Sequence, residues 1–113
     1  MIIRWYIDGN IARAKVQVGG THYLEGNWKP DWVNMTARIA GKGSTPTILD
    51  INDDGVSIFT YRPAITEGQT EKRWTTISGN TLRDGSIITL DIDQIFDQDT
   101  LRDLTVELHL SEV

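Results

Sequence analysis

Cysteine is absent from this chain of 113 residues, so neither a disulfide framework nor a thiolate metal site can support its fold. The only two histidines, His22 and His109, are too far apart in sequence to form a metal-ligand motif. No apolar run approaches the roughly 20 residues of a membrane-spanning helix. The first residues also lack the basic segment and long apolar stretch of a signal peptide. We therefore expect a soluble protein that is not exported through a signal of its own.

Basic residues are scarce as well. Lys and Arg number 11 against 16 Asp and Glu, which gives a formal net charge of −5. Binding to nucleic acid depends on basic groups that displace the counterions of phosphates, and docking on an anionic membrane also needs basic groups. The composition therefore predicts neither nucleic acid nor a membrane as a partner.

Apolar residues that alternate with polar ones are abundant. In the clearest case every second residue from Leu104 to Leu110 is apolar. A period of two is typical of strands that face a core on one side and water on the other. The pattern predicts about eight strands, at 2–7, 12–18, 33–39, 46–52, 56–60, 71–78, 88–92 and 104–110.

Turns rich in glycine and aspartate separate these segments. The turn 52–55 (NDDG) predicts a hairpin, because Gly55 can adopt a positive φ between two apolar runs. No segment has a helical period of useful length, and no linker or repeat divides the chain, so we expect a single domain, residues 1–113. The predicted fold class is all-β: one antiparallel β-sandwich of about eight strands, jelly-roll-like.

The segment 27–32 (NWKPDW) is the most informative local feature. We expect a loop here because of its proline, and two tryptophans in a loop are costly to expose. Trp28 and Trp32 could stack on sugar rings, form hot spots of a protein interface, or cap the open end of their own sandwich. Trp5 and Tyr6 belong to a segment that is apolar on both faces, which predicts either full burial or pairing with a neighbouring subunit or the capsid surface.

One acidic segment partly matches a calcium loop. Asp50, Asn52 and Asp54 provide oxygen ligands at its first, third and fifth positions, with Gly55 at the sixth. Tyr61, however, stands where the closing glutamate should be. We therefore interpret the segment as a hairpin turn and expect no metal ion.

A second acidic cluster consists of Asp91, Asp93, Asp97 and Asp99, of which Asp91 and Asp93 share the outward face of a predicted strand. They could bind a cation, but a solvated face with Arg83 or Arg102 nearby is the simpler interpretation. Paired carboxylates also occur in glycosidases, yet nothing here marks one of them as desolvated beside an aromatic side chain. With no nucleophile elbow and no phosphate loop, the sequence predicts no enzyme and no cofactor.

The order of the segments after residue 43 resembles small β-sandwich domains of tailed-phage virion proteins. These domains include tail-fibre and spike modules and capsid decoration (cement) proteins. The opening residues 5–11 match more loosely, and 26–32 departs from the pattern. The segments that carry the resemblance are 44–52 (STPTILDIN), 55–59 (GVSIF), 62–68 (RPAITEG), 82–85 (LRDG), 88–95 (ITLDIDQI) and 103–108 (DLTVEL).

The resemblance implies a protein of the virion, assembled in the host cytoplasm, that associates with itself, commonly as a homotrimer. It carries over no catalytic residues. The leading hypothesis is a capsid decoration protein that stabilises the shell through contacts with itself and with the major capsid protein or another virion protein. The alternative is a carbohydrate- or receptor-binding module of a tail or head fibre, which would bind a host-surface glycan.

Overall fold

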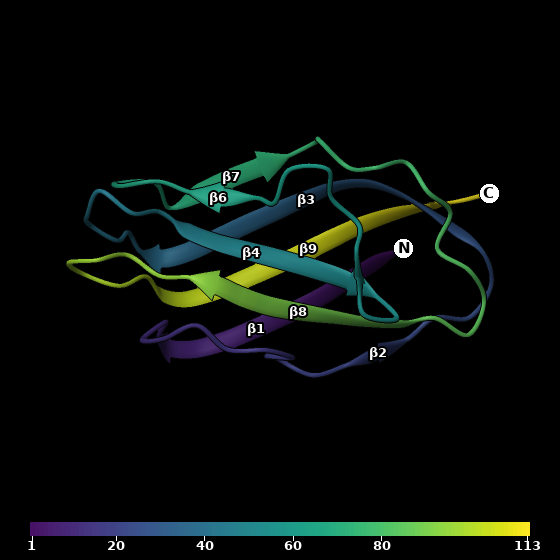
Figure 1. Ribbon diagram of the computed structural model, residues 1–113, viewed down its shortest axis with the longest axis horizontal. Helices are drawn as coiled ribbons and strands as arrows, with labels where there is room; N and C mark the ends of the chain where they lie inside the picture. Colours follow the sequence, from purple (N-terminus) through teal and green to yellow (C-terminus); the bar gives the residue numbers. More distant parts are fainter.

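Two antiparallel sheets pack face to face (Figure 1). The computed structural model describes residues 1–113, and no helix in it is long and apolar enough to cross a bilayer. The all-β prediction is confirmed, with nine strands in place of about eight. They are β1 (Ile2–Asn10), β2 (His22–Tyr23), β3 (Trp28–Ile39), β4 (Thr47–Asp53), β5 (Val56–Ser57), β6 (Ala64–Ile65), β7 (Glu71–Trp74), β8 (Ile87–Gln94) and β9 (Arg102–Glu112).

The strand order is that of a jelly roll. Sheet A has the order β1-β9-β3-β7, and sheet B has the order β2-β8-β4-β5, with β6 also paired to β4. Strands pair in a nested series, β1 with β9, β2 with β8, β3 with β7 and β4 with β5. Such nesting arises when one long antiparallel hairpin wraps around itself. The predicted hairpin at 52–55 is the tip of that series, where Asp54 and Gly55 adopt φ of 48° and 85°.

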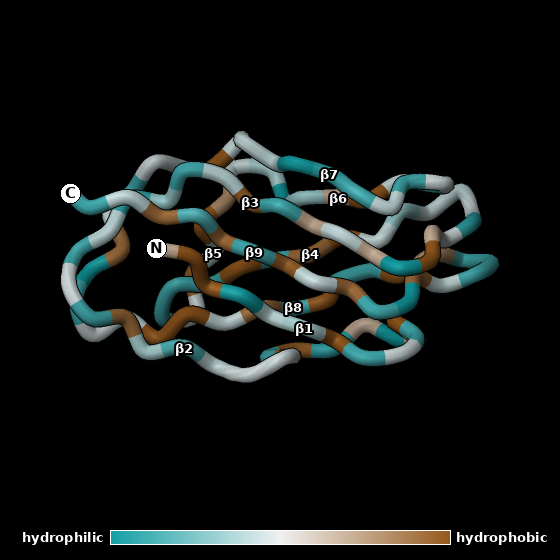
Figure 2. The backbone as a smooth tube through the Cα atoms, turned by 180° about the vertical axis from the view of Figure 1, so that it is seen from behind, coloured by the Kyte–Doolittle hydropathy of each residue, from teal (hydrophilic) through white to brown (hydrophobic).

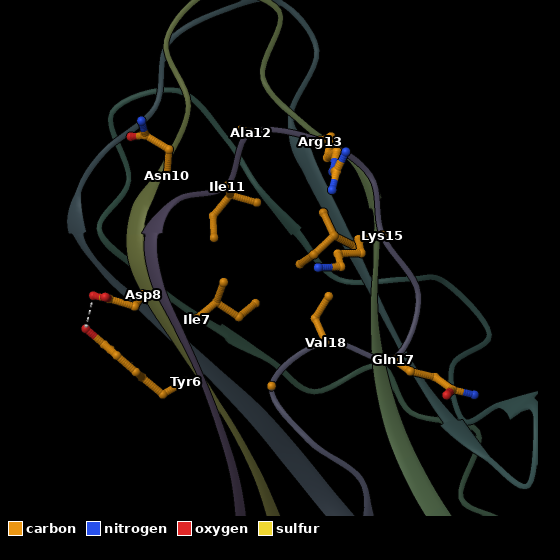
Figure 3. A pocket seen from close by; sticks show the side chains of 12 residues that line it. Tyr6, Ile7, Asp8, Asn10, Ile11, Ala12, Arg13, Lys15, Gln17 and Val18 are labelled. Atoms are coloured by element: carbon orange, nitrogen blue, oxygen red, sulfur yellow. Dashed lines mark hydrogen bonds between the residues drawn. The ribbon is translucent and has the colours of Figure 1, made fainter.

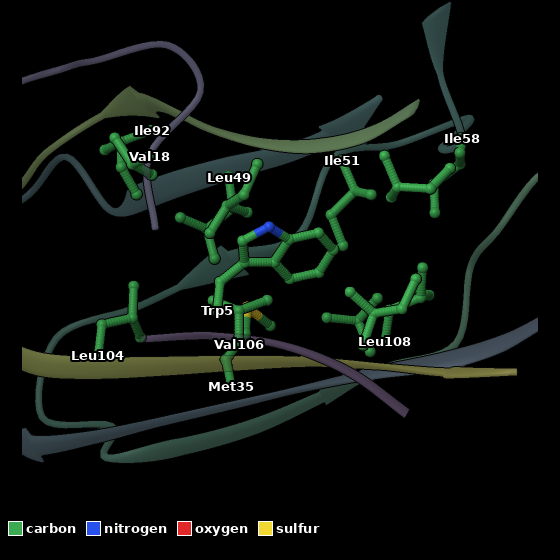
Figure 4. Close-up of a cluster of buried hydrophobic side chains, with 14 of the residues drawn as sticks. Trp5, Val18, Met35, Leu49, Ile51, Ile58, Ile92, Leu104, Val106 and Leu108 are labelled. Carbon is green, nitrogen blue, oxygen red and sulfur yellow. The ribbon is translucent and has the colours of Figure 1, made fainter. Parts of the chain in front are cut away.

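The inner faces of the two sheets form the core, as the alternating pattern predicts. In β9, Leu104, Val106 and Leu108 are fully buried, while the residues between them lie on the outer face. The alternation of apolar and polar residues is visible along the strands in Figure 2. Trp5 of sheet A lies in the middle of the core, and Leu49 and Ile51 of sheet B point toward it (Figure 4).

The predicted strand at 12–18 is wrong. This segment runs beside β8 but is bonded to it only intermittently: Lys15 and Ile92 exchange both backbone hydrogen bonds, and the Val18 N–H donates to the Leu90 carbonyl. Gln17 adopts a positive φ of 52°, which interrupts the pleat, and the expected alternation of burial is lost. Val16 is therefore 70 % exposed, although it belongs to the apolar set of the pattern.

The predicted loop at 27–32 is also wrong, because β3 already begins at Trp28. The pairing of β3 with β9 shifts register between Pro30 and Trp32. Strands tolerate proline at such a bulge, where the missing N–H interrupts no regular ladder. Elsewhere the strands expected at 56–60 and 71–78 are shorter than predicted, and β2 and β6 were not predicted.

The central position of Trp5 predicts a large effect of its removal. Its side chain is completely buried, and its indole N–H donates a hydrogen bond to the carbonyl of Gly20 at 3.1 Å. Trp5→Ala should lower the free energy of unfolding by about 3–5 kcal/mol, because a cavity replaces the ring. Urea denaturation followed by circular dichroism measures the loss.

Tyr6→Ala is the matched control, since the next residue points to the opposite face; it should change stability by about 0.5 kcal/mol or less. A loss below 1 kcal/mol for Trp5→Ala would contradict the central role of this side chain.

Because the 23 buried hydrophobic residues form one cluster, we also propose that the chain is one domain. Fluorescence and circular dichroism should then report the same denaturation midpoint.

Candidate functional site

The four tryptophans occupy different environments. Trp5, an interface candidate from the sequence, is a core residue. Trp28 is half-buried against the core, and its indole N–H donates to the carbonyl of Glu25 at 2.7 Å. Trp74 likewise packs against the core, and its N–H donates to the Tyr61 carbonyl. Of the four, only Trp32 has a buried indole N–H without a hydrogen-bond partner.

Trp32 lies on the outer face of sheet A between two side chains from neighbouring strands. His109 of β9 stacks on it with ring centroids 4.8 Å apart and planes at 21°. Arg73 of β7 places its guanidinium carbon 4.9 Å from the centre of the Trp32 ring. Since β9 and β7 flank β3 on opposite sides, His109 and Arg73 reach the Trp32 ring from two different neighbouring strands. A sugar ring needs a free π-face, so this geometry disfavours the predicted stacking of a glycan on Trp32.

The rest of this outer face is broad and mixed in character. Ile2 lies opposite His109, and Tyr6, four residues further along β1, lies opposite Thr105. Ile2 and Tyr6 are 46 % and 53 % exposed, which leaves apolar surface uncovered beside the Trp32 stack. Between them, Arg4 donates to Glu107 at 2.6 Å. Tyr6 therefore lies on the surface, and its contact with a partner stays a prediction.

Charged residues lie at the end of this face that is close to Tyr6. Asp103 accepts hydrogen bonds from the Arg38 side chain and from the Gly9 N–H, and both bonds hold its pKa below the usual range. Tyr6 donates to Asp8 at 3.3 Å. Partial desolvation and the nearby carboxylates of Asp103 and Asp8 raise the pKa of Tyr6, so it stays neutral at physiological pH.

The outer face of sheet B is acidic. Asp50 of β4 lies directly opposite Asp91 of β8, and like charges in this arrangement destabilise a sheet. Burial raises the pKa of Asp50, and the charges of Asp93 and Asp91 raise it further. The Ser57 hydroxyl donates to Asp50 at 2.5 Å and, together with Arg62, acts in the opposite direction.

The calcium candidates are engaged in hydrogen bonds within the protein. Asn52 donates to Asp91 at 2.9 Å, and Asp54 accepts the Ile87 N–H at 2.8 Å as part of the hairpin turn. Asp93 is paired with Arg62 at 2.6 Å, not with Arg83 or Arg102 as predicted. No group of three or more His, Cys, Asp or Glu side chains is arranged to hold a metal ion.

A groove on the open side of the sandwich was not predicted. It lies between β1 and the segment 11–19 and has a volume of about 430 Å³ (Figure 3). A second, separate groove of about 460 Å³ lies between the first residues of β1 and the segment 22–25. Arg13 and Lys15 line the first groove. The one available signal in the sequence was the absence of acidic residues from 9 to 24, in a chain with a net charge of −5.

Comparison with known proteins identifies the fold. The sequence matches no protein-family model and no curated protein. Among solved structures, a chain from the capsid of Ralstonia phage GP4 superposes with a TM-score of 0.63 and 14 % sequence identity. The match covers 100 % of this chain and 84 % of that chain. The resemblance to β-sandwich domains of phage virion proteins is thus confirmed at the level of the fold.

The environment of Asp50 predicts how stability depends on pH. Because its pKa is raised in the folded state, the folded protein holds this proton more tightly than the unfolded chain does. Asp50 therefore destabilises the fold at pH 7, and the penalty disappears as the pH falls. Asp50→Asn keeps an acceptor for the Ser57 hydroxyl but removes the charge, so it should raise the melting temperature at pH 7. The difference from the unmodified protein should vanish below about pH 3, where aspartate is protonated in both states.

Asp93→Asn is the control on the same face. It removes an attraction to Arg62 on a partly exposed pair, so it should cost between 0 and about 1 kcal/mol at pH 7. Melting curves at several pH values test both variants. A lower melting temperature for Asp50→Asn at pH 7 would show that its carboxylate stabilises the fold.

Proposed function

We propose that this chain is a structural protein of a tailed-phage virion, namely a decoration (cement) protein on the capsid surface. The observation that carries the proposal is the likeness of its whole length to a chain of a phage capsid, of which it covers most. The role is structural and involves no catalysis. Its partners are further copies of itself and the major capsid protein.

The outer face of sheet A is the surface best suited to contact the shell. Its three longest strands, β1, β3 and β9, make a stiff platform. Ile2 and Tyr6 expose apolar surface on this platform, and covering it contributes about 25 cal/mol per Å². The Trp32 stack is already ordered by His109 and Arg73, so its side chain loses little freedom on binding.

Symmetry would make a modest contact sufficient. A homotrimer fits the local threefold positions of an icosahedral shell, and one trimer presents the same face to the shell three times. Once one subunit is bound, the others bind at a high effective concentration. The decoration protein would thus bridge neighbouring capsid subunits and resist their separation under heat or internal pressure.

A groove of about 600 Å³ beside β4 supports a second candidate function, glycan or receptor binding on a tail or head fibre. It is lined by Tyr61, which is 70 % exposed, together with Asp50 and Arg62. An exposed aromatic ring beside a carboxylate and a guanidinium offers both stacking and hydrogen bonds to a sugar. In this candidate Tyr61 takes the role that the sequence assigned to Trp28 and Trp32.

Particles of the parent phage prepared without this protein provide the test. Adding the purified protein should saturate the shell at many copies per particle and raise the temperature at which the particles break. The double variant Ile2→Asp/Tyr6→Asp should bind at least tenfold more weakly, a loss of about 1.4 kcal/mol, because carboxylates would be buried at the contact. Occupancy is measured by quantitative gel analysis of sedimented particles.

Tyr61→Ala is the matched control, since it removes an exposed aromatic residue from the loop between β5 and β6, away from the outer face of sheet A. It should leave both occupancy and particle stability unchanged. A few copies at the tail, together with glycan binding that disappears in Tyr61→Ala, would overturn the decoration role and support the fibre module.

A further inference from the structure

The outer edge of β1 carries unpaired backbone groups. Met1 and Leu110 exchange both backbone hydrogen bonds, at 2.9 and 2.8 Å, so the bonds to β9 fall on the odd-numbered residues of β1. The N–H and C=O groups of Ile2, Arg4 and Tyr6 consequently point away from β9. No other strand pairs with β1, and no hydrogen bond from the rest of the chain reaches these groups. The strand has neither lysine nor proline, the residues that commonly protect an edge.

The 430 Å³ groove lies directly alongside this edge and has an apolar floor. Ile11, Val18 and Ile92 are almost fully buried there, and Ile7 is partly buried. Figure 3 shows Ile7, Ile11 and Val18 pointing toward the middle of the groove, with Asp8 directed away toward Tyr6. A side chain from a strand added to β1 would enter this space.

The wall opposite β1 is cationic. Arg13 and Lys15 line it, and neither forms an ion pair, whereas Arg4, Arg38 and Arg62 each have a carboxylate partner. Two unpaired cations beside an apolar floor favour an occupant that brings its own carboxylate. A second copy of this chain is a poorer occupant, because two chains that each carry a net charge of −5 repel each other.

We propose that β1 and this groove bind an extended segment of a partner protein as an added strand. The segment carries an apolar side chain and a carboxylate two residues apart, because residues i and i+2 of a strand point to the same face. The apolar side chain lies over Ile7 and Val18, the carboxylate pairs with Arg13 or Lys15, and the backbone bonds to Arg4 and Tyr6. The identity of the partner rests on the proposed function: if this chain decorates a capsid, the added strand is an arm of another shell protein.

Two capped peptides test the proposal, acetyl-Thr-Val-Thr-Glu-Thr-amide and its counterpart with Lys in place of Glu. In ¹⁵N-edited NMR titrations of the full chain, the glutamate peptide should shift the amide signals of Arg4, Tyr6 and residues 13–18. The lysine peptide should bind at least tenfold more weakly. In the variant Arg13→Glu/Lys15→Glu this preference should reverse.

The variants Arg4→Pro and Arg4→Ala test the edge itself. Both lose the ion pair with Glu107, but only proline removes the outward N–H and blocks strand addition. Arg4→Ala should bind the glutamate peptide like the unmodified protein, and Arg4→Pro should lose binding. Equal binding by both variants, equal affinity for both peptides, or no shifts at millimolar peptide would overturn the proposal.

Attachment to phage particles separates this proposal from the decoration role. If the unmodified protein and Arg13→Glu/Lys15→Glu occupy the shell equally, the groove is not the docking site, while the decoration role stands. If the unmodified protein does not attach at all, the decoration role fails. The peptide titrations alone then decide whether β1 and the groove bind an added strand.

Discussion

The long strands of this protein bury one face and leave the other free, because the two sheets cover each other on one side only. Trp5 lies where the inner faces meet, fully buried and bonded through its indole N–H to Gly20. That burial fixes which residues can form surfaces. Ile2, Arg4 and Tyr6 face outward because Ile3 and Trp5 face inward. The platform on sheet A, the acidic face of sheet B and the groove beside β1 all follow from this single division.

The fold was largely predictable, since a period of two in the sequence directly reflects one-sided burial. The pattern was reliable over 88–92 and 104–110, where every apolar residue of the alternation is buried. It failed at 12–18 because the same alternation occurs there in a segment whose backbone turns at Gln17 and Gly19. A hydropathy pattern does not reveal that a glutamine adopts a positive φ. The opposite error occurred at Pro30: its presence predicted a loop, but a bulge allows proline inside the long strand β3.

The candidate surfaces were less predictable, because they depend on which strands become neighbours. Trp32 was identified from its residue type, but its partners His109 and Arg73 come from strands far away in the sequence. Arg62, not Arg83 or Arg102, neutralises Asp93 for the same reason. The groove was missed because it combines an unpaired strand edge with a segment that was itself mispredicted as a strand. Register and strand order, not composition, decide these groupings.

The nested pairing of the strands has a consequence for how the protein forms. The amino terminus bonds to Leu110, 109 residues further along, and β9 lies between β1 and β3 at the centre of sheet A. Contacts of such long sequence separation form slowly, because a large loop must close before they are made. A nascent chain that has not yet reached β9 lacks sheet A and therefore lacks every surface built on it. The surfaces on sheet A would therefore become able to bind a partner only after β9 has been synthesised and has paired with β1 and β3.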